Sequence, residues 1–295
     1  MKVYGAIDIG SNAARLLIGE VYDVDGLKHF KKRSLVRVPL RLGAEVFELG
    51  KIPENKADDI VKSMIAYKNL LDVNHVSEFV AVATSAMRDA SNGSEIVERV
   101  KKESGIDIKI IEGKTEAKIL YSTHFEELLS PEKSYLYIDV GGGSTEVSLI
   151  ANGEFKNTRS FNIGTIRLLQ DSVSNAHWTE MKNWIEEHTL NDKNIEGIGS
   201  GGNINKLFKL NGSRADKQIS YKELASLYEQ LEEYSNLERI IKLGMRGDRA
   251  DVILPATKIF LKVAKWAKIK EINVPKFGLS DGLVRMLANK LEFTL

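Results

Sequence analysis

Two glycine-rich turns are the stretches of this sequence whose residue types are best suited to chemistry. The clearer one runs from Tyr135 to Glu146 and reads Y-L-Y-I-D-V-G-G-G-S-T-E, with Asp139 before the glycines and Glu146 after them. Glycines carry no Cβ atom, so the backbone can turn sharply and its N–H groups can close on a ligand. Clustered N–H donors suit phosphate oxygens, and paired carboxylates suit a hard divalent cation. We therefore predict a phosphate cradle made of Gly141, Gly142, Gly143, Ser144 and Thr145.

The same design occurs near the start of the chain. An apolar run from Val3 to Ile9 contains one acid, Asp8, and is followed by the turn Gly10-Ser11-Asn12 and a second apolar run. A pair of ordinary β-hairpins is the alternative, but two such turns, one opening each half of the chain, favour phosphate binding. We expect two more members of the cradle, Ser11 and Asn12. We also expect a cation held from two opposing loops by Asp8, Asp139 and Glu146.

Hydrophobic periodicity predicts the strands and helices that position these turns. The first half is expected to contain strands at Val3–Ile9, Arg15–Val21, His29–Val38, Phe79–Ala83 and Ile106–Ile111. Its expected helices are Glu54–Leu71, one that begins at Ser91 or Asn92 and ends at Glu103, and one from Gly113 through Leu128. The segment Thr84–Ala90 is expected to be a loop. The second half is expected to contain strands at Tyr135–Val140, Val147–Ile150, Glu154–Asn162, Ile195–Ile198 and Glu271–Val274, and helices at Thr165–Asp171, Thr179–His188, from Asn203, Tyr221–Glu233 and Asp248–Lys268. This repetition predicts two related α/β domains, 1–130 and 131–295, with the active site in the cleft between them and a final helix that could pack back on the first domain.

Composition limits the classes of function. The 295 residues have 43% hydrophobic content, enough for two packed cores, and a net charge of +1, which argues against a nucleic-acid binder driven by overall charge. The chain has no cysteine, so it can form neither disulfides nor thiolate metal sites. No signal-peptide pattern and no apolar run of membrane-spanning length occurs, so we expect a cytoplasmic protein without a membrane partner. A homodimer stays open.

Five motifs together resemble the exopolyphosphatase and guanosine pentaphosphate phosphohydrolase (Ppx/GppA) family, in its short two-domain form. They are D-I-G-S-N from Asp8, T-S-A-M-R-D-A from Thr84, E-G-K-T-E-A from Glu112, D-V-G-G-G-S-T-E from Asp139 and R-A-D-V-I-L-P from Arg249. The resemblance implies two RNase H-like domains of the actin, sugar-kinase and Hsp70 superfamily. The chain departs from the family pattern at Ala13, where a hydroxyl is frequent, and at Ser280, where an arginine is frequent.

The resemblance also implies roles for individual residues. Glu116 is implied as the catalytic base that aligns water, with Asp139 and Glu146 as further catalytic acids. From its position alone, the better interpretation of Glu116 is a first-turn acid favoured by the helix dipole. Arg88 leaves a buried strand, so we assign it to phosphate, with a surface ion pair to Asp89 as the alternative. Gly201 opens a helix that could receive phosphate, with helix–sheet packing as the alternative.

The function expected from these residues is an Mg²⁺-dependent (or Mn²⁺-dependent) hydrolase that releases terminal orthophosphate from polyphosphate. A guanosine pentaphosphate phosphohydrolase, a guanosine polyphosphate sensor of the same fold and a kinase of the same superfamily are the alternatives. The chain has 42 basic and 41 acidic residues, so no large excess of positive charge is available to grip long chains. We therefore expect a distributive enzyme.

Overall fold

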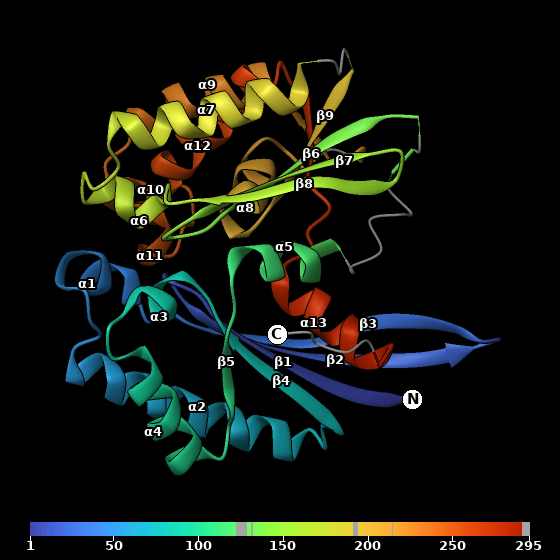
Figure 1. Ribbon diagram of the computed structural model, residues 1–295, viewed down its shortest axis with the longest axis vertical. Coiled ribbons are helices and arrows are strands. Elements are labelled where there is room, and N and C mark those ends of the chain that lie inside the picture. Colours follow the sequence, from blue (N-terminus) through green and yellow to red (C-terminus); the bar gives the residue numbers. More distant parts are fainter. Residues whose placement is uncertain (122–128, 131, 191–193, 214, 291–295) are drawn as a thin grey trace. The chain divides into compact units, whose positions relative to one another are not determined.

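The computed structural model describes residues 1–121, 129–130, 132–190, 194–213 and 215–290 of the chain (Figure 1). The chain forms two compact units. The first unit consists of Met1–Thr123 and Gly278–Leu295, and the second of His124–Phe277. Each unit contains one mixed sheet and its own hydrophobic core. Among the described residues, no helix is both long and apolar enough to cross a membrane.

The first unit is built on a five-stranded sheet in the order β3-β2-β1-β4-β5. Its strands are β1 (Lys2–Ile9), β2 (Ala14–Val24), β3 (Leu27–Val38), β4 (Glu78–Ala83) and β5 (Ile108–Ile110). The first three pair antiparallel, whereas β4 runs parallel to β1 and β5 parallel to β4. Strand β1 is buried along seven of its eight residues, as its apolar sequence requires of a central strand covered on both faces. Strand β3 forms the exposed edge and is rich in lysine and arginine, which discourages pairing with other chains.

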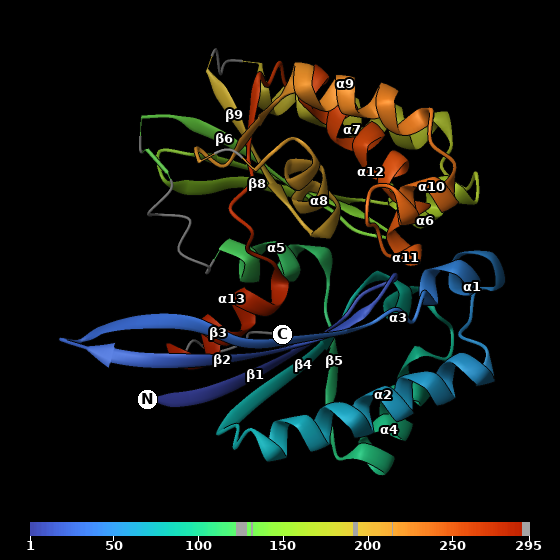
Figure 2. The ribbon, with the colours of Figure 1, turned by 180° about the vertical axis from the view of Figure 1, so that it is seen from behind.

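Helices cover both faces of this sheet (Figures 1 and 2). They are α1 (Leu42–Leu49), α2 (Glu54–Val73), α3 (Ser85–Asp89), α4 (Gly93–Ser104), α5 (Gly113–Tyr121) and α13 (Leu279–Ala288). Helices α2 and α4 pack together on one face, while α13 lies on the other face against β1, β2 and β4 and also contacts α5. Helix α13 therefore supports α5, which carries Glu116.

The second unit has a six-stranded sheet in the order β10-β11-β9-β6-β7-β8. Its strands are β6 (Ser134–Val140), β7 (Thr145–Ala151), β8 (Glu154–Phe161), β9 (Ile195–Ser200), β10 (Gln218–Ser220) and β11 (Glu271–Asn273). Its helices are α6 (Thr165–Leu169), α7 (Asn175–Thr189), α8 (Gly202–Leu210), α9 (Tyr221–Glu232), α10 (Asn236–Ile241), α11 (Gly247–Ala250) and α12 (Ile253–Trp266). Helix α12 is central to the packing, because it contacts α6, α7, α8, α9 and β6 and buries Ile253, Phe260 and Val263.

The two sheets repeat one plan. Three antiparallel strands are followed by parallel ones, in the order β3-β2-β1-β4-β5 in the first unit and β8-β7-β6-β9-β11 in the second. This confirms the predicted α/β class with two RNase H-like domains. The predicted boundary between residues 130 and 131 adjoins residues outside the described ranges, and it stays a prediction. The expected continuation of the Gly113 helix through Leu128 also lies outside the described residues.

The structure corrects several predicted elements. The predicted loop Thr84–Ala90 contains the short helix α3, and the single helix predicted at Asp248–Lys268 is divided into α11 and α12. Pro255 explains the division, because it lacks the N–H that would bond to the carbonyl of residue 251, so the helix begins again at Ile253. Helices α1 and α10 were not predicted, since both are short and only tertiary packing selects them.

Candidate active site

The glycine turn between β6 and β7 brings two acids face to face. Asp139 and Glu146 are direct partners in the antiparallel register, so their side chains project from the same face of the sheet. The turn closes on itself through a hydrogen bond from the Gly141 amide to the Ser144 carbonyl at 2.9 Å. The hydroxyl of Thr145, which is fully buried, donates to the Ile163 carbonyl at 2.6 Å. The turn is therefore pinned to the chain that leads into α6.

The carbonyl groups of the three glycines in this turn face α6. The Thr165 amide donates to the Gly141 carbonyl at 3.0 Å, and the Ile166 amide donates to the Gly142 carbonyl at 2.9 Å. The Arg167 Nε donates to the Gly143 carbonyl at 2.8 Å. No cis peptide bond occurs in the described chain. In a trans peptide unit the N–H points opposite to the C=O. The amides of Gly142, Gly143 and Ser144 consequently point away from α6, as three successive donors directed to one side. Arg167 thus anchors the turn.

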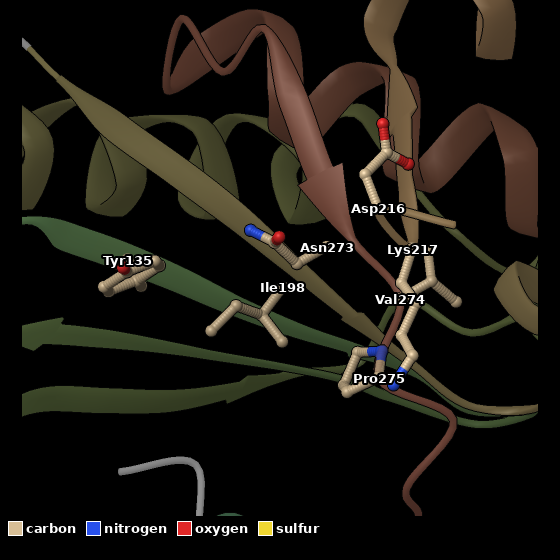
Figure 3. A pocket seen from close by; sticks show the side chains of 7 residues that line it. All are labelled: Tyr135, Ile198, Asp216, Lys217, Asn273, Val274 and Pro275. Atoms are coloured by element: carbon tan, nitrogen blue, oxygen red, sulfur yellow. The ribbon is translucent and has the colours of Figure 1, made fainter. Parts of the chain in front are cut away.

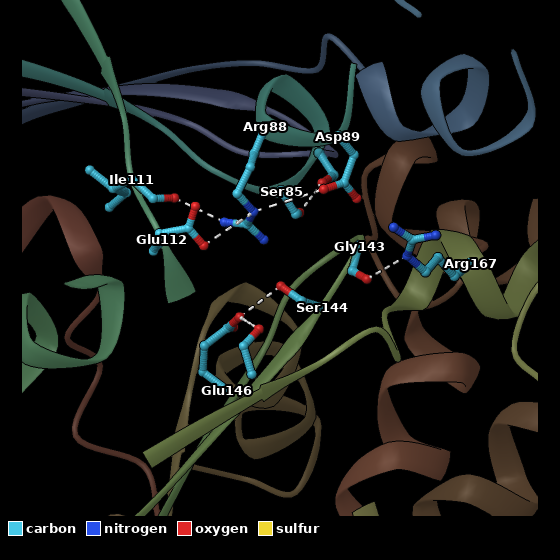
Figure 4. Close-up of polar contacts among 11 residues, drawn as sticks. Ser85, Arg88, Asp89, Ile111, Glu112, Gly143, Ser144, Glu146 and Arg167 are labelled. Atoms are coloured by element: carbon cyan, nitrogen blue, oxygen red, sulfur yellow. Dashed lines mark hydrogen bonds and ion pairs between the residues drawn. The ribbon is translucent and has the colours of Figure 1, made fainter. Parts of the chain in front are cut away.

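Glu146 is held in place by two hydroxyl groups (Figure 4). Its side chain is buried, and its Oε1 accepts hydrogen bonds from Ser144 Oγ at 2.7 Å and from Ser160 Oγ at 2.8 Å. These bonds satisfy a carboxylate that burial would otherwise destabilise, and they restrict its rotamer. Ser160 was not predicted as a site residue, although strand pairing places it directly opposite Glu146.

Gly201 stands beside the first of the two acids. Its φ angle is +97°, and a Cβ atom at this position would lie 3.2 Å from Asp139 Oδ1. Any larger residue would therefore be strained and would crowd the carboxylate. The neighbouring Gly202 carbonyl accepts a bond from Arg249 Nη1 at 2.7 Å. Arg249 thus fixes the start of α8 next to the acid pair.

The first unit has the equivalent turn with a different pair of residues. The Gly10 amide bonds to the Ala13 carbonyl at 3.1 Å, as Gly141 does to Ser144 in the second unit. Asp8 is buried and faces Arg15 in the register, and the two form an ion pair at 2.7 Å. Arg15 occupies the position that Glu146 occupies in the second unit, so the negative charge of Asp8 already has a cationic partner. This pair was not predicted, although strand alternation opposite Asp8 points to Arg15.

The predicted phosphate residues of the first unit lie around this turn. The carbonyls of Ser11 and Asn12 accept bonds from the amides of Gly43 at 2.8 Å and Arg41 at 3.0 Å. By the same trans-peptide geometry, the amides of Asn12 and Ala13 point away from the α1 end of the unit. The Ser11 hydroxyl, which is buried, bonds to Ser85 Oγ at 2.7 Å. Ser85 begins α3 and was not singled out in the sequence.

Arg88, at the end of α3, has protein partners on the same unit (Figure 4). Its Nη1 donates to the Ile111 carbonyl at 2.9 Å, and its Nε lies 3.8 Å from Asp89 and 3.9 Å from Glu112. The ion pair with Asp89 that was the alternative interpretation is therefore formed. One fifth of the side chain is exposed.

Glu116 lies in the first turn of α5, where its amide bonds to the Glu112 carbonyl at 3.0 Å. The helix is held against α13 at a very close approach. A Cβ atom on Gly282 would lie 2.2 Å from the Ile119 carbonyl oxygen, one helical turn after Glu116. Only glycine permits this spacing, so Gly282 sets how close α13 comes to the helix that carries Glu116.

The donor set of the second unit fits a hard divalent cation. Among the described residues, no group of three or more acidic, histidine or cysteine side chains is arranged to hold a metal ion. Mg²⁺ is commonly held by only one or two carboxylates, with water and substrate phosphates as the other ligands. The facing pair Asp139 and Glu146 meets this requirement, whereas Asp8 is paired with Arg15.

A separate pocket of about 70 Å³ opens between β6, β9, β11 and the segment that leads into β10 (Figure 3). It is lined by Tyr135, Ile198, Asp216, Lys217, Asn273, Val274 and Pro275. Tyr135 lies at the opposite end of β6 from Asp139. The pocket has room for only a few water molecules and is too small for a chain of phosphates.

A family profile, curated relatives and solved structures all point to the same protein family. The profile of the Ppx/GppA phosphatase family matches residues 21–291 of this chain. A curated relative, exopolyphosphatase 1 of Mycobacterium bovis, is 23% identical over 95% of this chain and 86% of its own length. A solved exopolyphosphatase structure from Cytophaga hutchinsonii superposes with a TM-score of 0.84, at 24% identity and 99% coverage of both chains. The Ppx/GppA family member of Aquifex aeolicus gives a TM-score of 0.76 at 25% identity, again over 99% of both chains.

Proposed function

The chain belongs to the Ppx/GppA phosphatase family, and from this premise we propose that it is an exopolyphosphatase that releases orthophosphate from the end of inorganic polyphosphate. The observation that carries the proposal is the β6–β7 turn, where three successive amides point to one side and two carboxylates face each other. Polyphosphate suits both parts of such a site. Its anionic oxygens accept hydrogen bonds from the amides, and they also coordinate a divalent cation held by the carboxylates. The relatives from Mycobacterium bovis and Cytophaga hutchinsonii, both named exopolyphosphatases, support the same substrate class.

The terminal phosphate is bound by the glycine turn of the second unit, where the amides of Gly142, Gly143 and Ser144 donate to its oxygens. In the first unit, Ser11, Asn12 and Arg88 are the residues that we propose for phosphate binding, because they offer donors and positive charge. Fixed donors of this kind stabilise the charge that spreads over the phosphoryl oxygens during transfer without having to reorganise. The anchoring of the turn by Thr165, Ile166 and Arg167 keeps those donors fixed.

Asp139 and Glu146 would hold Mg²⁺ or Mn²⁺, and Asp8, which is paired with Arg15, is the further proposed ligand. The cation would supply neutralisation of the charge on the phosphates. Glu116 orients the attacking water and accepts its proton, which is the role of a general base. The orthophosphate leaves with the oxygen of that water, and the shortened polymer leaves as the other product.

One experiment tests the proposal and its alternatives together. Phosphate release is measured with Mg²⁺, with Mn²⁺ and in EDTA, on polyphosphates of several lengths, guanosine pentaphosphate and ATP side by side. We expect the highest kcat/KM on polyphosphate and no turnover in EDTA. Preferential turnover of guanosine pentaphosphate would assign the chain to that alternative, and tight guanosine polyphosphate binding without turnover would make it a sensor. Sedimentation tests whether the chain forms a homodimer, and cell fractionation tests the expected cytoplasmic location.

A further inference from the structure

Helix α12 carries an unusual local excess of positive charge. The segment 252–270, which contains the helix, has five lysines and no acidic residue, although the whole chain has a net charge of only +1. Three of these lysines, Lys258, Lys262 and Lys265, are spaced by four and three residues. At that spacing they lie along one side of the helix, opposite the buried side formed by Ile259, Phe260 and Val263. We call these three residues the lysine face.

The lysine face has no neutralising partners on the part of the chain that the structure describes. None of its three ammonium groups forms an ion pair or a hydrogen bond with a described residue. Lys258 and Lys265 are exposed, and Lys262 is half-buried. Burial first, and the charges of Lys258 and Lys265 second, lower the pKa of Lys262. Some other surface lysines of the second unit meet a carboxylate, as Lys242 meets Glu238 and Lys182 meets Glu186.

Two indole rings hold the central lysine in place. The Lys262 ammonium lies 4.8 Å from the ring centroid of Trp178 on α7 and 5.5 Å from that of Trp266 on α12. The two rings meet edge to face, with centroids 6.1 Å apart. Cation–π contacts of this kind restrict a side chain that would otherwise be mobile. The lysine face therefore has a fixed centre between two rigid rings, unlike a set of freely moving surface lysines.

We propose that the lysine face, with Trp178 and Trp266, is an auxiliary site for the body of a polyphosphate chain, separate from the glycine turns that receive its terminal phosphate. The inference rests on the proposed function, since it assumes that the substrate is a polyanion. Charge complementarity selects the occupant: three aligned cations without a carboxylate among them match a linear ligand with a negative charge on every unit. Lys258 and Lys265 are about 10 Å apart along the helix at 1.5 Å per residue, so the site engages a short stretch of chain. Such a site raises affinity for longer chains without making the enzyme processive.

The kinetic test compares chain lengths. The variant Lys258→Ala/Lys262→Ala/Lys265→Ala should raise KM for long polyphosphate by roughly 3- to 30-fold, because each exposed charge contact contributes modestly. Its kcat, and its KM for tripolyphosphate, should match those of the wild type. The slope of log KM against log salt concentration should also fall by about 2. In single-stranded nucleic acids each phosphate contact contributes ~0.7 to such a slope, and this variant removes three lysines. The control Lys62→Ala/Lys102→Ala/Lys222→Ala removes the same charge from exposed lysines elsewhere and should leave KM unchanged.

A binding test needs no turnover. In EDTA, we expect long polyphosphate to change the tryptophan fluorescence of the wild type, since two of the three tryptophans contact Lys262. The variant Lys258→Ala/Lys265→Ala keeps that contact and should bind at least several-fold more weakly. An equal KM in both triple variants, or an unchanged titration in the double variant, would overturn the proposal. So would tighter binding of a single-stranded oligonucleotide of equal charge. These outcomes differ from a failure of the proposed function. In that case the wild type would release no phosphate from any polyphosphate.

Discussion

Asp139 and Glu146 stand directly opposite each other in the pairing of β6 and β7. At the equivalent place in the first unit, the pair is Asp8 and Arg15, which attract each other. Like charges facing each other across a strand pair are destabilising unless a cation lies between them. The two turns are otherwise similar, but the first has Arg15 where the second has Glu146. The second turn is therefore the better cation site.

We predict that Mg²⁺ stabilises the wild type against thermal unfolding, by up to about 3 kcal/mol at a hundredfold excess over its Kd. Glu146→Gln keeps an acceptor for Ser144 and Ser160 but removes the facing charge, so it should lose this stabilisation and most turnover. Its stability in EDTA should equal or exceed that of the wild type, because the repulsion with Asp139 is gone. Thermal melts with Mg²⁺ and with EDTA provide the measurement. An equal Mg²⁺ shift in both proteins would remove Glu146 from the cation site.

The variant Glu116→Gln tests the base. General-base catalysis is typically worth ~10²–10⁴-fold, so kcat should fall by about that factor while KM for polyphosphate changes little. Steady-state phosphate release gives both constants. If the variant retains a kcat within about threefold of the wild type, Glu116 is the helix-dipole acid of the alternative interpretation and has no role in proton transfer.

Gly164 tests the anchoring of the glycine turn. A Cβ atom there would lie 2.2 Å from the Gly142 carbonyl oxygen, and backbone atoms cannot move aside cheaply. Gly164→Ala should therefore displace the three amides and lower kcat/KM by roughly 10²-fold, the usual effect of a displacement near 1 Å. Gly247→Ala is the matched control, because its nearest contact would be an ordinary 3.8 Å. Circular dichroism and melting temperature should show that both variants fold. Wild-type kinetics in a folded Gly164→Ala protein would contradict the prediction.

A substitution of Gly282 should change turnover, because Gly282 sets the position of α5 and therefore of Glu116. Gly282→Ala places a methyl group against the Ile119 carbonyl and must move α5 or α13, at a cost of about 1–3 kcal/mol in stability. We expect kcat to fall and KM to remain nearly constant, because Glu116 shifts while the glycine turns do not. The control Gly278→Ala, with its nearest atom 4.0 Å away, should keep kcat. A stability loss with unchanged kcat would confine Gly282 to packing.

Tyr67 gives a prediction at alkaline pH. Its hydroxyl is buried and donates to the Ala14 carbonyl at 3.0 Å, and burial is the main cause that raises its pKa to about 12. The folded state then keeps a proton that the unfolded state loses near pH 10, so this contribution to stability is complete below about pH 10 and is lost as the pH rises toward about 12. Urea unfolding from pH 8 to pH 11 should show a steeper loss in the wild type than in Tyr67→Phe. Parallel curves would contradict the assignment.

Both the fold class and the two glycine turns could be predicted from the sequence, for a local reason. Apolar runs ended by an acid and glycines determine a strand and a turn without reference to the rest of the chain. The repetition of this pattern predicted two related domains. The short helices α1, α3 and α10 could not be predicted in this way, because too few residues contribute and packing selects them.

The sequence by itself determined which residue types stand at the turns, and strand alternation alone places Asp139 and Glu146 on one face. Only the tertiary structure decided what each of these groups touches. It placed Arg15 on Asp8, Ser160 on Glu146 and Arg167 on the Gly143 carbonyl. It also brought Gly282 against Ile119, across more than 150 residues of chain. Contacts between residues so far apart depend on how whole elements pack, and local residue preferences carry no information about that packing.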